Sequence, residues 1–291
     1  MWAIYALLSA FFAASCDPIA KRVLSLRDGD EYLIGWAGLI LSTPFLAILY
    51  FSHPIAPFSP ALIKTLAVIV PIEILAVVLY YRALKLTDIS LSVPFLALTP
   101  VFVILTAFLL LGERLPPHGI LGIVLITIGA YSLNLNEIRS GIFHPIKAIL
   151  SNKGSLYMIA VALLFSLTSA ISKKAMLYSS PESIPFIYNL SISLLMAPLI
   201  LYRLKNGRSV LSKDPKTILS YVLIGLFAAL SSACYFRSIS TANVAYTISI
   251  KRLSLLMSVG YGWFFFRERD IRIHLVSAFC MFLGVVLIFL S

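Results

Sequence analysis

Three charged side chains stand inside long apolar stretches of the sequence: Glu73, Lys251 and Arg252. At the centre of a membrane helix a charge costs about 2.5–3.5 kcal/mol on insertion scales, so such residues usually face a cavity or a partner. A lysine offers a compact positive charge, and an arginine offers a planar fork that matches a carboxylate or phosphate. The pair at 251–252 therefore predicts the binding of an anionic group. Since adjacent residues point about 100° apart on a helix, we expect one of the pair to hold ligand while the other pairs within the protein.

A polar stripe contains Lys251. Its members, Thr247, Lys251, Ser254, Ser258 and Tyr261, recur at steps of 4, 3, 4 and 3 residues, which is the helical period. We expect the stripe to line a central cavity. The alternative is that its hydroxyls bond back to carbonyls of their own helix.

Glu73 has three open roles: a counter-ion for Lys251 or Arg252, a proton carrier, or a ligand for an ammonium group. If Glu73 and the basic pair all meet the substrate, a zwitterion such as an amino acid fits the site. If they pair only with each other, neither reports the charge of the substrate. Tyr80 follows Glu73 by two helical turns and points to the same side.

The composition indicates the class of protein to which these residues belong. Of its 291 residues 60% are hydrophobic and 12% are charged, against about 45–50% and 25% in soluble domains. This excludes an ordinary soluble enzyme and a disordered chain, and it indicates an all-α integral membrane protein. The net charge of +11 falls mostly in short gaps between apolar runs, so it is read as loop charge and not as a nucleic-acid site.

Apolar windows of membrane-spanning length predict ten transmembrane helices. Their ranges are 2–21, 32–51, 61–82, 89–111, 118–135, 154–173, 184–202, 217–237, 244–266 and 273–290. The long gap at 136–153 divides the chain into two blocks of five helices, residues 1–137 and 138–291. No stretch predicts a separate soluble domain.

The two blocks resemble each other. A shift of 155 residues places Tyr80 on Tyr235 and Glu113 on Glu268, and a shift of 153 places Lys21 on Lys174. Because five is an odd number, the second block must enter the membrane from the opposite side, which makes the chain an inverted repeat. Secondary transporters are often built in this way, with the substrate between the halves. The shift also maps the stripe onto Ser92 and Thr99, whose hydroxyls are expected on the opposing cavity wall. The hydroxyls of Tyr80 and Tyr235 either approach the cavity from opposing walls or belong to an aromatic belt at the membrane interface.

Two motifs resemble the signature of EamA-type transporters of the drug/metabolite transporter superfamily. One runs from Tyr80-Tyr-Arg-Ala-Leu-Lys to Pro94 and continues through Thr99-Pro100 to Leu111-Gly-Glu-Arg114. The other starts at Tyr235-Phe-Arg and ends at Phe266-Arg-Glu-Arg269. The resemblance implies ten helices in two inverted repeats around a central cavity, and cytoplasmic termini. The second copy has Ser254-Leu255 in place of Thr99-Pro100, so the substrates of relatives do not carry over.

The loop charges favour the opposite orientation. Of 23 basic residues, 16 fall in odd-numbered loops, 5 in even-numbered loops and two, Lys251 and Arg252, within a helix. The positive-inside rule then places both termini outside the cytoplasm. The orientation stays open.

Several other residues receive weaker predictions. Asp17 is read as a solvated helix end because Lys21 follows four residues later, with a cavity acid as the less favoured alternative. Lys173 is read as a residue that can snorkel to the surface. Asn189 is expected to hydrogen-bond another helix. Glu113 and Glu268 are read as structural partners of neighbouring arginines. The last group, Gly119, Gly122, Gly129 and Gly284, is assigned to internal packing and not to dimerisation.

No sequence motif indicates enzymatic chemistry. The chain has no phosphate-binding loop of the Gly-x-x-x-x-Gly-Lys type, no nucleophile elbow and no metal-ligand spacing among its four histidines. We therefore expect no catalytic residue, no metal and no cofactor. The expected partners are a small-molecule substrate and the lipid bilayer, with a proton or counter-substrate as coupling partner. A monomer is compatible with the sequence.

These features predict a multi-pass plasma-membrane transporter that works by alternating access through a central cavity. Its cargo would be a small anionic or zwitterionic metabolite, such as an amino acid, an organic acid or a phosphorylated compound. Two alternatives remain: an exporter of amphipathic or cationic compounds that depends on Glu73, and a component of a lipid-linked sugar flippase.

Overall fold

The computed structural model describes residues 1–26, 29–53, 59–87, 93–132, 153–212, 214–257 and 271–291. These ranges are helical and contain no strand, which confirms the all-α class. The first half has α1 (Trp2–Leu24), α2 (Glu31–Phe51), α3 (Pro60–Leu86), the 3₁₀ helix η1 (Val93–Leu98), α5 (Thr99–Leu111) and α6 (Pro117–Ser132). The second half has α8 (Lys153–Met176), α9 (Ile184–Lys205), α10 (Pro215–Ile239), α11 (Val244–Lys251) and α13 (Ile271–Phe289).

Six helices of the described chain are long and apolar enough to cross a membrane: α1, α2, α3, α8, α9 and α10. Three shorter apolar helices lie at Phe95–Leu111, Pro117–Ser132 and Val276–Phe289. A hydrocarbon core about 30 Å thick needs about 20 helical residues, so the six helices support a multi-pass membrane protein. The prediction of ten spans stays a prediction.

Local signals explain where the helices begin. Asp30, Ser59 and Asp214 are N-caps whose side chains accept a hydrogen bond from a backbone N–H of the first turn. Prolines at Pro60 and Pro215 occupy the first helical position, where no N–H is needed. α1 runs past the predicted end at residue 21 to Leu24, with basic residues in its last turn, where the helix dipole favours them.

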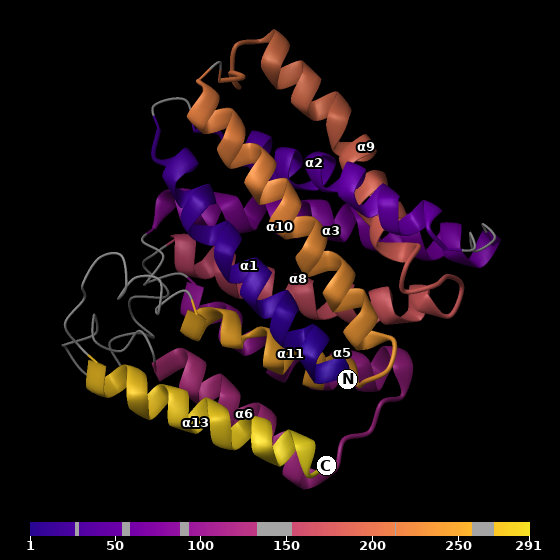
Figure 1. Ribbon diagram of the computed structural model, residues 1–291, viewed down its shortest axis with the longest axis vertical. Helices are drawn as coiled ribbons and strands as arrows, with labels where there is room; N and C mark the ends of the chain where they lie inside the picture. Colours follow the sequence, from indigo (N-terminus) through magenta and orange to yellow (C-terminus); the bar gives the residue numbers. More distant parts are fainter. Residues whose placement is uncertain (27–28, 54–58, 88–92, 133–152, 213, 258–270) are drawn as a thin grey trace.

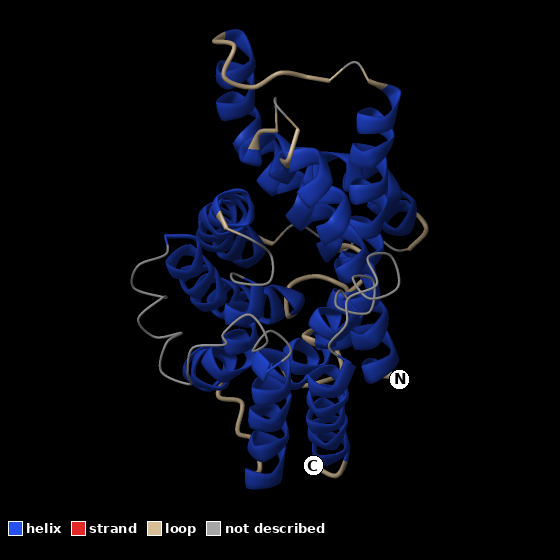
Figure 2. Cartoon of the chain, turned by 90° about the vertical axis from the view of Figure 1, so that its left-hand side faces the viewer, coloured by secondary structure: helices blue, strands red, loops and turns tan. Residues whose placement is uncertain are grey.

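The helices pack in pairs that join the two halves of the chain. α1 lies along α10, α3 along α8, and α6 along α13, while α2 packs against both α9 and α10 (Figure 1). α1 begins and α13 ends on the same side of the molecule, where the rings of Trp2 and Phe289 stack with centroids 5.7 Å apart. Figure 2 gives the view after a 90° turn.

Small residues permit the closest of these contacts. A Cβ at Gly122 of α6 would lie 2.6 Å from the carbonyl oxygen of Gly284 in α13, and a Cβ at Gly129 would lie 2.8 Å from that of Ser277. Such distances leave no room for a side chain. The interpretation of Gly122, Gly129 and Gly284 as internal packing residues is confirmed, and Gly119 likewise packs against Tyr246 inside the protein.

Candidate functional site

The helix predicted at 244–266 is interrupted at Arg252, which corrects the expectation of one continuous helix. α11 ends at Lys251, Arg252 forms a turn, and residues 253–257 are helical again. The N–H of Arg252 is shared between the carbonyls of Ile248 and Ser249, and that of Leu255 bonds to the Arg252 carbonyl, which is 3₁₀-type tightening. The stripe at Thr247, Lys251 and Ser254 is therefore not one straight face.

The corresponding segment of the first half changes conformation at the same place. There η1 ends at Leu98 and α5 begins at Thr99, with Pro100 at its start. Proline has no N–H to continue the helix ladder, which explains a break at this point. The shift of 155 residues maps Arg252 onto Ala97, so the two interruptions coincide.

Arg252 connects the two interruptions. Its Nη2 donates a 2.8 Å hydrogen bond to Oγ1 of Thr99, which in turn donates to the carbonyl of Leu96 at 2.7 Å. The Arg252 side chain is buried, and its Nε has no hydrogen-bond partner. Arg252 is thus the member of the basic pair that is engaged within the protein, and Thr99 is its partner.

Lys251 is held differently. Its Nζ lies 4.7 Å from the centre of the Tyr235 ring, a cation–π contact. Within the described residues Lys251 makes no ion pair or hydrogen bond, although Asp17, Glu73 and Arg252 lie within electrostatic range. An ammonium group has three donors, and all three of these are available to a ligand.

Glu73 lies beside the hydroxyls of Thr168 and Tyr188 and within electrostatic range of Lys251. It forms no ion pair with either residue of the basic pair in the described chain, and its Oε2 is buried without a hydrogen-bond partner. Glu73 and Lys251 thus interact without direct contact, and the three roles of Glu73 stay predictions.

Asp17 is a site residue for which a cavity acid was the less favoured of two predictions. It lies inside α1 and its Oδ1 accepts a 2.6 Å hydrogen bond from the Tyr80 hydroxyl. Both Arg252 and Lys251 are within its electrostatic range. The prediction of a solvated end was wrong because α1 continues to Leu24 and Lys21 binds elsewhere, to the carbonyls of Leu84 at 2.7 Å and Thr87 at 3.2 Å. The signal was an acidic residue before a proline within an apolar run.

These contacts bring together six side chains, here called the central polar cluster: Asp17, Glu73, Tyr80, Tyr235, Lys251 and Arg252. Three of its buried polar atoms lack a partner in the described residues: Oε2 of Glu73, OH of Tyr235 and Nε of Arg252. A buried unsatisfied group costs about 1–3 kcal/mol. Several of them in one cluster favour a site that a polar ligand completes.

Other predicted site residues have partners of their own. Thr247 Oγ1 lies 2.9 Å from Ser238 Oγ, and both residues are buried between α11 and α10. Ser254 is also buried. Ser92, Ser258 and Tyr261 lie outside the described residues, so their place in the site stays a prediction.

A cavity of about 450 Å³ lies away from the cluster, at the end of the protein where the termini meet. Its lining includes Trp2, Lys173, Tyr246 and Phe289 and none of the predicted site residues. It is a groove between helix ends, and no residue of the central polar cluster lines it.

Polar contacts at the helix ends position the elements that carry the cluster. Lys173 pairs with Glu113 at 2.6 Å and donates to the carbonyl of Ala242 at 2.7 Å, while Glu113 also accepts the N–H of Val244 at 3.1 Å. The prediction that Lys173 snorkels was therefore wrong. Glu113 is structural as predicted, but its partner is a lysine. Asn189 donates to Ser42 of α2 at 2.9 Å, which confirms its expected interhelical bond.

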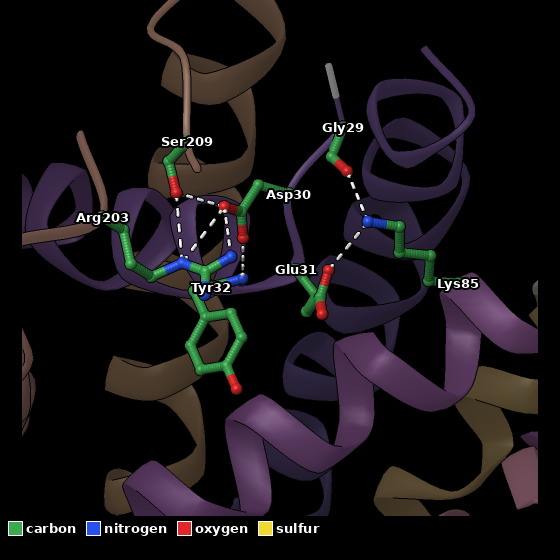
Figure 3. A network of polar contacts seen from close by, with 7 residues as sticks. All are labelled: Gly29, Asp30, Glu31, Tyr32, Lys85, Arg203 and Ser209. Carbon is green, nitrogen blue, oxygen red and sulfur yellow. Dashed lines mark hydrogen bonds and ion pairs between the residues drawn. The ribbon is translucent and has the colours of Figure 1, made fainter. Parts of the chain in front are cut away.

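A second polar network lies at the start of α2 (Figure 3). Arg203 of α9 binds Asp30 at 2.9 Å and stacks over Tyr32 with its guanidinium carbon 4.2 Å from the ring centre, and Ser209 also bonds to Asp30. Burial by itself would raise the pKa of the Asp30 carboxyl, but hydrogen bonds from Ser209, Arg203 and the Tyr32 N–H outweigh it and lower this pKa. Nearby, Lys85 of α3 pairs with Glu31 at 3.0 Å.

A bundle of membrane-length helices with charged groups gathered in its interior defines a multi-pass membrane protein with an internal polar site. Comparison with known families specifies it further: the model of the EamA-like transporter family matches residues 1–135 and 152–290. The chain belongs to this family, within the drug/metabolite transporter superfamily, whose members move small molecules across membranes and are not enzymes.

The comparison of structures concerns the fold alone. Twenty-nine chains of solved structures match this chain. One, a protein determined by crystallography, is similar over 98% of both chains with a TM-score of 0.76 and 15% sequence identity. No curated protein matches the chain in sequence.

Proposed function

We propose that this protein is a secondary transporter of a small anionic or zwitterionic metabolite in the plasma membrane. In this proposal residues 1–137 and 138–291 form two inverted five-helix repeats that rock around the central polar cluster, so that the cluster meets each side of the membrane in turn. Proton coupling and exchange are both compatible with it.

The observation that carries the proposal is the state of Lys251. Its ammonium lies in the protein interior over the Tyr235 ring and makes no ion pair or hydrogen bond in the described chain. A cation in the interior of a membrane protein is costly. The anionic group of a substrate would supply the missing acceptor, and the unpartnered OH of Tyr235 would bond to the same ligand.

Ligand-induced thermal stabilisation of the purified protein tests this proposal. The panel is made of amino acids, organic acids, sugar phosphates and lipophilic cations at two pH values. A ligand at 100 times its Kd stabilises by about 2.7 kcal/mol, which a melting curve resolves. We expect one anionic or zwitterionic class to raise the Tm of the wild type and to have no effect on Lys251→Gln.

The matched control is Lys174→Gln, which removes an exposed lysine and should keep the full ligand effect. Stabilisation by anionic ligands that is unchanged in Lys251→Gln would contradict the proposal.

Transport of cationic compounds is the second candidate, and the unpartnered Oε2 of Glu73 favours it. In that case lipophilic cations would stabilise the protein, and Glu73→Gln would remove the effect while Lys251→Gln would keep it. Silence across the whole panel would direct the search to lipid-linked cargo.

A further inference from the structure

The connection between α9 and α10, residues 206–214, has exposed apolar and basic side chains next to each other. Val210 and Leu211 are adjacent in sequence and are 50% and 59% exposed. The basic residues Lys205 and Arg208 are exposed just before them. Apolar side chains that lie exposed together and are bordered by polar ones mark a surface that meets a partner or a membrane.

Hydrogen bonds fix the conformation of this connection. Gly207 has a φ of +66°, which lets the chain turn at the end of α9. Ser209 is 3% exposed and donates a hydrogen bond to Asp30 at the start of α2 (Figure 3). Because Ser209 points inward, the following residues, Val210 and Leu211, are held on the outside of the protein. Their exposure is thus a built feature of the turn.

The connection lies at the level of the bilayer surface. α9 has 22 residues and is about 33 Å long at about 1.5 Å per residue, against a hydrocarbon core of about 30 Å. α10, with 25 residues, is longer still. Tyr202, in the last turn of α9, is 57% exposed, and tyrosine is a residue type enriched at the membrane interface. The connection also lies at the outer edge of the molecule, at the top of Figures 1 and 2, where lipid surrounds it.

The charge of this surface is positive. Lys205, Arg208 and Lys216 are exposed and form no ion pair within the part of the chain that the structure describes. The acids of the same region have other roles, since Asp30 pairs with an arginine inside the network of Figure 3 and Asp214 caps α10. Three free cations at the level of the headgroups attract anionic lipids.

We propose that the α9–α10 connection is a docking surface for the headgroups of anionic phospholipids. Lys205, Arg208 and Lys216 bind headgroup phosphates, while Val210 and Leu211 enter the boundary between headgroups and acyl chains. Because the connection is bonded to the start of α2, lipid bound there stabilises the contact between α2 and α9. This surface is separate from the central polar cluster, and its role does not depend on the cargo.

Thermal unfolding of the purified full-length protein in nanodiscs tests the proposal. One set of discs contains phosphatidylcholine alone, and the other contains phosphatidylcholine and phosphatidylglycerol in equal parts. We expect phosphatidylglycerol to raise the Tm of the wild type by about 3 °C or more at low salt, and by less at high salt, because salt screens exposed charges. In Lys205→Gln/Arg208→Gln/Lys216→Gln this rise should fall by half or more.

The matched control is Lys64→Gln/Arg114→Gln/Lys174→Gln, which removes the same number of exposed positive charges outside the connection. It should keep the full rise in Tm. An equal loss in both triple variants would overturn the proposal, since net charge alone would then explain the lipid effect. The same Tm for wild type in both lipids would also overturn it. So would an equal rise on adding inorganic phosphate to the phosphatidylcholine discs, which would assign the cations to a soluble anion.

A spin label at position 211 tests whether the apolar part of the surface enters the bilayer. It is attached to Leu211→Cys in a chain whose native cysteines, Cys16, Cys234 and Cys280, are replaced by alanine. In discs with phosphatidylglycerol we expect oxygen, which concentrates among the acyl chains, to reach this label more readily than a water-soluble nickel complex does. A label at the exposed polar residue Asn206 should show the reverse. Greater access of nickel than of oxygen at position 211 would contradict the docking of this surface on lipid.

Discussion

The two halves of the chain agree at their helix ends and differ inside. Lys21 binds the carbonyl of Thr87 after α3, and Lys173 binds that of Ala242 after α10. Thr87 and Ala242 are related by the shift of 155 residues. The contacts therefore pair Lys21 with Lys173 and correct the sequence match of Lys21 with Lys174, which is exposed.

The charges of the central polar cluster have no such agreement, although its two tyrosines, Tyr80 and Tyr235, are related by the shift. The shift places Lys251 on Leu96, Arg252 on Ala97 and Glu73 on Ala228. Every one of these charges exists in one half only. Repeated residues thus join helix ends and let helices approach, whereas unrepeated residues supply the charges. We infer that the repeat provides the frame and that its asymmetry provides the chemistry.

The most damaging single change should be the introduction of a charge at Leu96, the position that the repeat relates to Lys251. Leu96 is buried, so Leu96→Lys is expected to destabilise the fold by about 2.5–3.5 kcal/mol. The matched change Lys251→Leu removes the charge from the corresponding position and should raise the Tm while abolishing ligand stabilisation, because residues kept for function often cost stability. Melting curves of both variants check this. Equal losses of stability would contradict the division between frame and chemistry.

Overpacking the α6–α13 contact should come next. In Gly284→Val the Cβ would lie 2.5 Å from the carbonyl oxygen of Gly122, so the backbones must separate. Overpacking typically costs about 1–3 kcal/mol, and a backbone contact belongs at the upper end. The control Leu283→Val alters a more exposed neighbour and should change the Tm little. A Tm of Gly284→Val within 1 °C of wild type (about the error of the measurement) would refute this role for the glycine.

A smaller loss is expected at the end of α5. Glu113→Gln removes the charge that binds Lys173 and weakens the bond to the Val244 N–H, at a cost of about 1–2 kcal/mol. The control Glu182→Gln breaks a more exposed pair with Arg237, and such pairs contribute about 0–1 kcal/mol. Thermal unfolding of both variants measures the difference. Ligand affinity should be unchanged in both, because neither residue belongs to the cluster.

The smallest change in stability is expected at one end of the α2–α9 pair. The two ends of this pair are held by different contacts. One end has the network of Asp30 and Arg203, and the other has the rings of Tyr50 and Phe186 with centroids 4.8 Å apart. Because the folded protein lowers the pKa of Asp30, the stabilisation by this carboxylate is present above the ordinary aspartate pKa of about 3.9 and is lost as the pH falls through the folded value. Between pH 6 and pH 3 the Tm of Asp30→Asn should therefore fall less than that of wild type. Parallel curves would contradict it.

Much of the fold could be predicted from the sequence because apolar run length largely determines a membrane helix. The break at Arg252 could not, since it depends on a partner, Thr99, in the other half of the chain. Asp17 was assigned to a helix end from its spacing to Lys21. In the structure, however, Lys21 donates its hydrogen bonds to backbone carbonyls of another part of the chain. The spacing of residues along the sequence predicts which side chains are neighbours on one helix, but it does not predict their contacts with another helix.

The polar stripe shows the same limit within the candidate site. Helical period grouped Thr247 with Lys251 on α11. It could not show that Ser238 of α10 bonds to the threonine, while the lysine has no hydrogen bond or ion pair among the described residues. The rarity of charged residues in apolar runs predicted the site better than helical period did, because a charge in such a run is costly wherever its neighbours lie. Glu73, Lys251 and Arg252 were all found in that way.

Saturable uptake into liposomes shows whether the unrepeated charges of the central polar cluster carry the substrate. The ligand that stabilises the wild type is radiolabelled, and uptake is compared between wild type, Lys251→Gln and Lys173→Gln, each reconstituted at equal folded amount. We expect Lys251→Gln to abolish saturable uptake, whereas Lys173→Gln, which alters only a repeated helix-end contact, should retain it. Equal uptake by Lys251→Gln and wild type, or loss of uptake in Lys173→Gln alone, would contradict the claim that the unrepeated charges carry the function.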